Sequence, residues 1–253
     1  MDRLVFTSSV AINEQGVSRQ SYIHELANTS TVGFKGSYDV ALRTVKVEGE
    51  SFDTRYMPQK VSKNQIRMDP GTVMATGRAL DVAMTQKTVL AVRADNGEMA
   101  FTRRGDLEVN LRGQLETGGG QLVLGENGPI SVPPGLLVTI AADGTITARD
   151  PNETDVQQPV QIGRLLLRDA SETPLSRRKD GLFQVYGKPP GADIPPGPNL
   201  PGLIPQALEG SNINPIEAMT RLLDNSRSFE TQTRIIKETR DLDESGASMM
   251  KIA

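Results

Sequence analysis

The residue types that most often carry catalysis are scarce in this sequence. His24 is the single histidine, and there is no cysteine. A Ser-His-Asp triad would have to use His24, which lies within a predicted helix and far in sequence from any Ser-rich turn. The lack of cysteine excludes disulfides, thiol nucleophiles and thiolate metal sites. A metal site would depend mainly on carboxylates, and none are grouped at ligand spacing.

Three short patterns that could carry chemistry have simpler interpretations. Asp241, Asp243 and Glu244 form the densest acidic cluster. A calcium loop would also need a loop glycine and a following bidentate Glu, so we expect a solvated helix face. The glycine run 118–120 lacks the Gly-Lys-Ser/Thr ending of a phosphate loop. Residues 176–179 match Ser-x-x-Lys in a basic loop, where we expect a turn. We therefore predict no enzyme activity and no cofactor.

Charge and hydropathy limit the classes of partner. The net charge of −3 argues against a broad nucleic-acid-binding face. We expect Arg103-Arg104 and the basic run 177–179 to be ordinary surface charge. No apolar run approaches the roughly 20 residues that span a bilayer, so no membrane insertion is expected. A cleavable secretory signal is not visible at the N-terminus. A hydrolase remains an alternative if four carboxylates converge in a cleft, namely Asp81, Asp95, Asp106 and Asp143.

The residues after 209 predict a long C-terminal helix. Ser211, Asn212 or Asn214 could cap its first turn, and Pro215 suits the first helical position. Within it, a narrow apolar stripe recurs by three and four: Met219, Leu222, Ser226, Phe229, Thr233 and Ile236. Such a narrow seam suits another helix. The alternative is a terminal helix that lies on its own domain.

The first 33 residues predict a second helix with little apolar surface. Val5, Ile12, Ile23 and Leu26 lie near helical spacing, and Gly16 weakens the interior. Because such a helix is marginal alone in water, we expect it to pair with the C-terminal helix. The predicted fold class is α+β, with paired terminal helices (1–33 and 209–253) and an inserted all-β domain.

The segments between the helices differ in composition. Residues 34–76 mix short strand-like pieces with polar runs and predict an extended, poorly packed connector. Residues 77–187 predict an antiparallel β domain of many short strands, with turns at Asp95-Asn96-Gly97 and Asp143-Gly144. The Pro-rich run 188–208 predicts a linker back to the C-terminal helix.

Three stretches together resemble the rod and hook family of bacterial flagella. They are the run from Leu26 to Lys35, the blocks 77–83, 101–105 and 113–115, and the run from Ala207 to Met219. They follow the family's order. The sequence departs from the family at His24-Glu25, where a pair of asparagines is usual, and at 85–88, where a Gly-Asp-Gly turn is usual.

The resemblance implies a non-catalytic structural subunit of the basal-body rod. Its terminal helices would polymerise as a coiled coil into the hollow drive shaft, and its form is most similar to the proximal rod. The alternatives are a distal rod or hook subunit, or a surface- or glycan-binding β module. The implied partners are other rod proteins and the flagellar type III export apparatus, which would deliver the chain to the periplasm-spanning rod without a cleavable signal. The implied assembly residues are Val5, Ile12, Ile23, Leu26, Asn28, Phe34, Asn212, Asn214, Met219, Leu222, Phe229 and Ile236.

Overall fold

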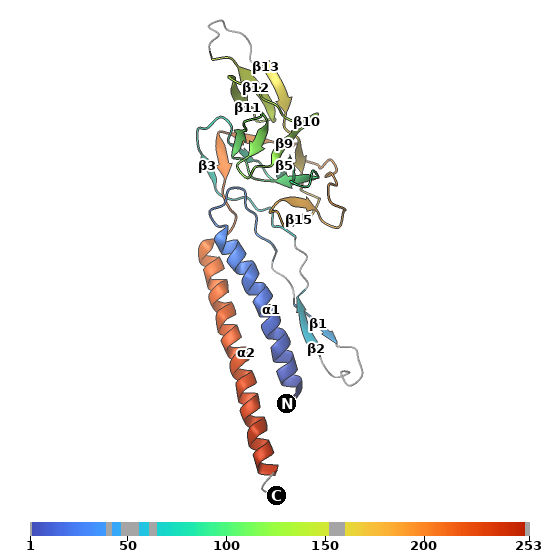
Figure 1. Cartoon of the computed structure of the whole chain (residues 1–253), viewed down its shortest axis with the longest axis vertical. Helices are drawn as coiled ribbons and strands as arrows, with labels where there is room; N and C mark the ends of the chain where they lie inside the picture. Colours follow the sequence, from blue (N-terminus) through green and yellow to red (C-terminus); the bar gives the residue numbers. More distant parts are fainter. Residues whose placement is uncertain (1, 39–41, 47–55, 61–64, 152–159, 251–253) are drawn as a thin grey trace. The chain divides into compact units, whose positions relative to one another are not determined.

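The computed structural model describes residues 2–38, 42–46, 56–60, 65–151 and 160–250 (Figure 1). The chain divides into two compact units. We call the first the helical unit; it comprises Met1–Asn28, Asp39–Lys63 and Ile213–Ala253. We call the second the β unit; it comprises Thr29–Tyr38 and Asn64–Asn212.

Two antiparallel helices build most of the helical unit. Helix α1 (Asp2–Ala27) lies beside α2 (Pro215–Met250), and the last turns of α2 continue past the start of α1 (Figure 1). Strands β1 (Leu42–Lys46) and β2 (Tyr56–Lys60) pair as a hairpin, with β2 alongside α1. Neither helix, nor any other in the described ranges, has an apolar stretch long enough to cross a bilayer.

The start of α2 follows from its cap. Pro215 occupies the first helical position, where a missing backbone donor costs nothing. The side-chain oxygen of Asn214 accepts from the amides of Ile216 (3.0 Å) and Glu217 (3.4 Å). Among the three predicted caps, Asn214 is the one that binds these first-turn amides.

The β unit holds antiparallel strands in four sheets within the described residues. Its largest sheet has the order β15-β16-β6-β5-β9-β8-β7, with β10 on β9 and β14 on β5; the others are β11-β12-β13, β17-β4 and β18-β3. Their bounds are β3 Val73–Ala75, β4 Val82–Met84, β5 Thr88–Arg93, β6 Met99–Thr102, β7 Leu107–Val109, β8 Leu115–Thr117, β9 Leu122–Gly125, β10 Gly128–Pro129, β11 Leu137–Ile140, β12 Thr145–Arg149, β13 Val160–Arg164, β14 Leu167–Asp169, β15 Leu175–Arg177, β16 Phe183–Val185, β17 Leu203–Pro205 and β18 Ala207–Glu209.

Strand β5 lies between two apolar cores. Successive side chains of a strand point to opposite faces of the sheet. Leu90 and Val92 therefore join one buried cluster, and Val89 and Ala91 join the other. Both predicted turns are confirmed: Gly97 and Gly144 take positive φ (83° and 84°) where β5 meets β6 and β11 meets β12. The predicted α+β class is also confirmed.

The observed boundaries of several elements differ from those that the sequence pattern predicts. Helix α1 ends at Ala27 rather than near 33, and residues 29–38 belong to the β unit. The Pro-rich run 188–208 does not stay a linker to its end, because β17 and β18 pair with β4 and β3. Glu209 is the last residue of β18 and not part of α2.

The ends of the expected connector are also well packed. Lys35 is fully buried, and Ile66 and Met68 belong to a core cluster. They pack because the backbone at 36–38 pairs with the backbone at 65–67, through the amides of Tyr38 and Arg67. Residues 39–41, 47–55 and 61–64 of the expected connector lie outside the described residues.

Gly33 provides a test of this packing. Its φ is +68°, and a side chain there would collide with the backbone carbonyl of Arg103. Gly187 has a similar φ of +74° and open space around it. Gly187→Ala should cost about 1–2 kcal/mol of the free energy of unfolding, the usual cost of a left-handed residue. Gly33→Ala should cost at least about 1 kcal/mol more, because backbone must also move. Urea unfolding of both variants checks this, and equal losses would contradict it.

Candidate functional site

The seam between the two helices contains both polar and apolar side chains. The covered positions of α1 include a set that recurs by three and four, Ser8, Ala11, Gln15, Ser18, Tyr22 and Glu25, and also the half-buried Val5, Phe6, Val10, Ile12 and Leu26. On α2 they include Ala218, Arg221, Leu222, Asn225, Ser226, Gln232, Ile235, Ile236 and Thr239. Gln15 donates its side-chain amide to the Ser228 hydroxyl (2.6 Å), and Asn225 donates to the Gln15 carbonyl (3.3 Å). Amide and hydroxyl groups therefore supply specific contacts where a coiled coil would usually place apolar side chains.

The predicted apolar stripes coincide with this seam only in part. Leu222 and Ile236 are half-buried, as are Val5, Ile12 and Leu26 on α1. Phe229, Met219 and Ile23 are exposed by 40–53%. Ser226 of the predicted stripe is also half-buried, whereas Thr233 is exposed, and Ala218, Asn225 and Gln232 are further covered positions. The periodic pattern did not include these three positions.

Helix α2 carries apolar side chains that the chain itself leaves exposed. Ile216, Met219 and Leu223 are exposed by 74%, 53% and 60%. At 3.6 residues per turn, they share one side of α2, which is adjacent to the side that carries Ala218 and Leu222. Leu242, Met249 and Met250, toward the end of α2, are also exposed. These side chains are available to another molecule.

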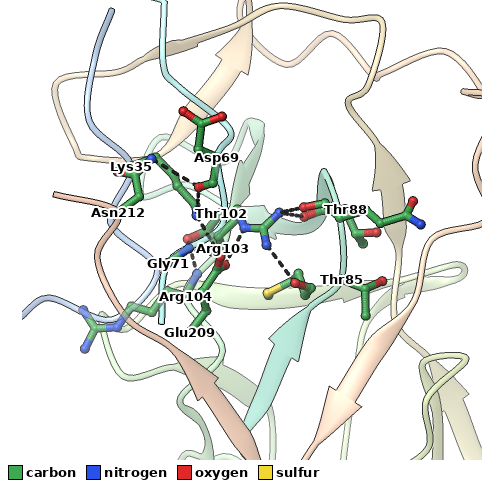
Figure 2. Close-up of polar contacts among 12 residues, drawn as sticks. Lys35, Asp69, Gly71, Thr85, Thr88, Thr102, Arg103, Arg104, Glu209 and Asn212 are labelled. Atoms are coloured by element: carbon green, nitrogen blue, oxygen red, sulfur yellow. Dashed lines mark hydrogen bonds and ion pairs between the residues drawn. The ribbon is translucent and has the colours of Figure 1, made fainter. Parts of the chain in front are cut away.

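A buried cluster of three charges lies in the β unit, where the segment after α1 meets the segment before α2 (Figure 2). One carboxylate oxygen of Glu209 accepts from the ammonium of Lys35 (2.8 Å) and from the amide of Gly71 (2.9 Å). The other accepts from the Nε of Arg103 (2.6 Å). The Lys35 side chain is fully buried, and those of Arg103 and Glu209 are 1% exposed.

Backbone carbonyls accept further hydrogen bonds from the two cations. Arg103 donates to the carbonyls of Met84 (2.7 Å), Gln86 (2.7 Å) and Thr88 (3.0 Å). Lys35 donates to the carbonyl of Asp69 (2.7 Å). Buried charges are tolerated only when they are paired and hydrogen-bonded in this way, since removing one partner commonly costs about 3–5 kcal/mol.

The two connecting segments also bind each other directly. The Gly33 amide donates to the Glu209 carbonyl (2.7 Å), and the Asn212 amide donates to the Phe34 carbonyl (3.2 Å). The Asn212 side chain accepts from the Gly36 amide (2.7 Å) and donates to the carbonyls of Arg67 and Asp69 (3.0 and 3.2 Å). Asn212 therefore joins three stretches of the β unit.

Four of the predicted assembly residues, Asn28, Phe34, Asn212 and Asn214, have local structural partners. Asn28 donates its side-chain amide to the His24 carbonyl (2.8 Å) at the end of α1. The Arg177 guanidinium lies 4.4 Å from the centre of the Phe34 ring, within reach of a cation–π interaction. Asn212 binds the segment at Gly36, and Asn214 caps the first turn of α2.

The charge cluster was not predicted from the sequence, and the expectation for one of its members was wrong. Arg103, which we expected to be surface charge, is buried. Glu209 neutralises its charge, and three backbone carbonyls accept its hydrogen bonds. Arg104 is partly exposed and pairs with Asp106 (2.7 Å). The one available signal was that Lys35, Arg103 and Glu209 each lie inside one of the three motif stretches.

The four carboxylates of the hydrolase alternative do not share a cleft. Asp81 and Asp106 are paired by an isolated β-bridge, but each carboxylate forms a salt bridge with an arginine. Arg78 donates to Asp81 (2.7 Å), and Arg104 donates to both oxygens of Asp106 (2.7 and 2.9 Å). Asp143 is the one of the four among the described residues that line a cavity of about 450 Å³.

Lys35 gives the cluster a pH dependence. Burial, helped by the nearby Arg103 charge, lowers the pKa of the Lys35 ammonium, while the bond to Glu209 opposes this. Between this folded-state pKa and about 10.4, the unfolded chain therefore binds more protons than the folded chain. The free energy of unfolding should rise with pH across that window, relative to Lys35→Met. Urea unfolding of both proteins from pH 7 to 10.5 measures the difference, and a flat or falling difference would contradict it.

Comparison with known proteins places these features in a family. Residues 204–249 match the model described as the flagellar basal body rod FlgEFG protein C-terminal, and residues 87–148 match the flagellar hook protein FlgE/F/G D1 domain. These matches include β18, the α2 cap and the exposed stripe of α2, together with much of the β unit.

Curated relatives extend the similarity to nearly the whole chain. The flagellar basal-body rod protein FlgF of Salmonella typhimurium is 39% identical over 93% of both chains. The protein of the same name from Escherichia coli is 38% identical over 95% of both. The rod protein FlgG of Buchnera aphidicola (subspecies Schizaphis graminum) is 28% identical over 92% of this chain and 94% of its own. At this identity and coverage, the chain belongs to the family of flagellar basal-body rod proteins.

Proposed function

We propose that this chain is a non-catalytic subunit of the proximal rod, which polymerises through its helical unit into a hollow shaft. The observation that carries the proposal is the exposed apolar stripe of α2, formed by Ile216, Met219 and Leu223. A screw-symmetric tube requires contacts between different patches on successive subunits. A helix that pairs with α1 along one side and exposes apolar groups along an adjacent side supplies two such surfaces.

Assembly would also stabilise the helices themselves. The large apolar side chains whose burial is described in α1 and α2 are at most half-buried, so the pair gains limited hydrophobic free energy alone. Neighbours that bind the folded pair would shift the folding equilibrium toward it by mass action. The predicted assembly residues that remain exposed, Ile23, Met219 and Phe229, are available for these contacts.

Assignment to the proximal rod rests on the relatives. Two proteins named FlgF are 38–39% identical to this chain, and three named FlgG from Buchnera are 27–28% identical over similar lengths. A distal rod subunit is the second candidate because those relatives also cover the chain almost completely. The proposed partners are other rod subunits and the flagellar type III export apparatus. The absence of cysteine supports export, since no disulfide has to form after passage.

A charge placed in the apolar stripe should block assembly while it leaves the monomer folded. Met219→Glu adds a carboxylate at an exposed position, so the free energy of unfolding should change by less than about 0.5 kcal/mol. In the assembled rod that carboxylate would be buried without a partner, which should reduce rod formation at least about tenfold. Thr231→Glu is the matched control, because Thr231 is exposed elsewhere on α2 and its hydroxyl donates to the Arg227 carbonyl of the same helix (2.9 Å).

The two variants are compared in a host strain that lacks the native gene. Swimming in soft agar and electron microscopy of isolated basal bodies measure rod formation, and circular dichroism of the purified proteins measures folding. Full rods with Met219→Glu would contradict the assembly surface. A full-length rod in the deletion strain without any complementing copy would contradict the assignment as a rod subunit.

A further inference from the structure

Three charged side chains that lie far apart in the sequence meet at one buried point. Lys35 follows α1, Arg103 follows β6, and Glu209 ends β18 just before α2 (Figure 2). Each belongs to a different part of the β unit, and two of them lie on the segments that lead to the helices. We call Lys35, Arg103 and Glu209 the latch.

We propose that the two connecting segments, residues 33–36 and 209–212, pair stably only once the β fold that holds Arg103 is complete. In this arrangement Lys35 can leave the latch while Arg103 and Glu209 stay paired. Arg103 reaches Glu209 only from a site formed by three carbonyls between β4 and β5. Those carbonyls take their places once β4, β5 and β6 have formed. Glu209 then has a buried cation to bind, and the carboxylate and the Asp69 carbonyl together receive Lys35.

The three members of the latch are not equivalent. Arg103 and Glu209 form a neutral buried pair, and Lys35 adds one positive charge that no second buried carboxylate neutralises within the latch. If Lys35 is removed, its two acceptors keep partners: Glu209 still accepts from the Gly71 amide, and the Asp69 carbonyl still accepts from Asn212. Methionine fills a similar volume, so Lys35→Met leaves neither a large cavity nor an unpaired buried charge.

Unlike Lys35, Glu209 cannot be replaced by a neutral residue without leaving buried charges unpaired. Glu209→Gln would leave two buried cations facing a neutral amide, so both segments and the sites that hold them should lose protection together. The asymmetry between Lys35→Met and Glu209→Gln distinguishes a releasable latch from a general stabilising contact. Arg168→Met is the matched control, since it removes a long cationic side chain from a partly exposed pair with Asp193 (2.7 Å).

Hydrogen exchange followed by mass spectrometry of the full-length chain tests the proposal. The informative amides are those of Gly33 and Gly36 in the first segment and Asn212 in the second, with peptides from β5 as the internal reference. In Lys35→Met, exchange in the 33–36 segment should accelerate at least tenfold, while β5 stays within twofold of the wild type. Arg168→Met should leave both regions unchanged.

Two results would overturn the proposal. One is wild-type protection of residues 33–36 in Lys35→Met. The other is an equal loss of protection there and in β5, which would make Lys35 an ordinary contributor to stability. Both are read on the isolated chain, so they are independent of whether the protein builds a rod. If Glu209→Gln does not fold, Lys35→Met and its control still decide.

Discussion

The ion pairs of the Glu209 carboxylate join the two segments through which the chain enters and leaves the β unit. The carboxylate is buried, and it binds one cation from the segment after α1 and one from the end of β6. A buried carboxylate without such partners would be strongly unfavourable. The charges therefore require that residues 33–36, 103 and 209 come together. That requirement fixes which backbone amides and carbonyls of the two connecting segments meet.

In the helical unit, hydrogen bonds link the two helices, and some of the apolar side chains of α2 are exposed. Its internal seam uses Gln15, Asn225 and Ser228, whose hydrogen bonds specify the register of the two helices but add little hydrophobic free energy. Its outer side exposes Ile216, Met219 and Leu223. Polar groups thus contribute hydrogen bonds to the intramolecular pairing, and these apolar groups stay exposed, as the proposed assembly requires. This division suits a subunit that is paired as a monomer and completed by assembly.

The sequence predicted the elements well and their interactions less well. Asn214-Pro215, Asn96-Gly97 and Asp143-Gly144 act through local backbone geometry, so short patterns were sufficient to place a cap and two turns. The latch depends on residues more than 60 positions apart, which no local pattern connects. Periodicity found Leu222 and Ile236 but not Asn225 and Gln232, because apolar patterning does not detect the polar positions of a mixed seam. The twelve predicted assembly residues remain a proposal, and several of them hold the monomer's own connections.

An electron cryo-microscopy map of the assembled rod would test this account most directly. We predict that each subunit keeps Glu209 within hydrogen-bond distance of Lys35 and Arg103, at about 3 Å. We also predict that Met219 and Leu223 of α2 are buried against a neighbouring subunit. Rods in which the Met219–Leu223 side of α2 faces solvent, or in which Glu209 has left both cations, would contradict the account.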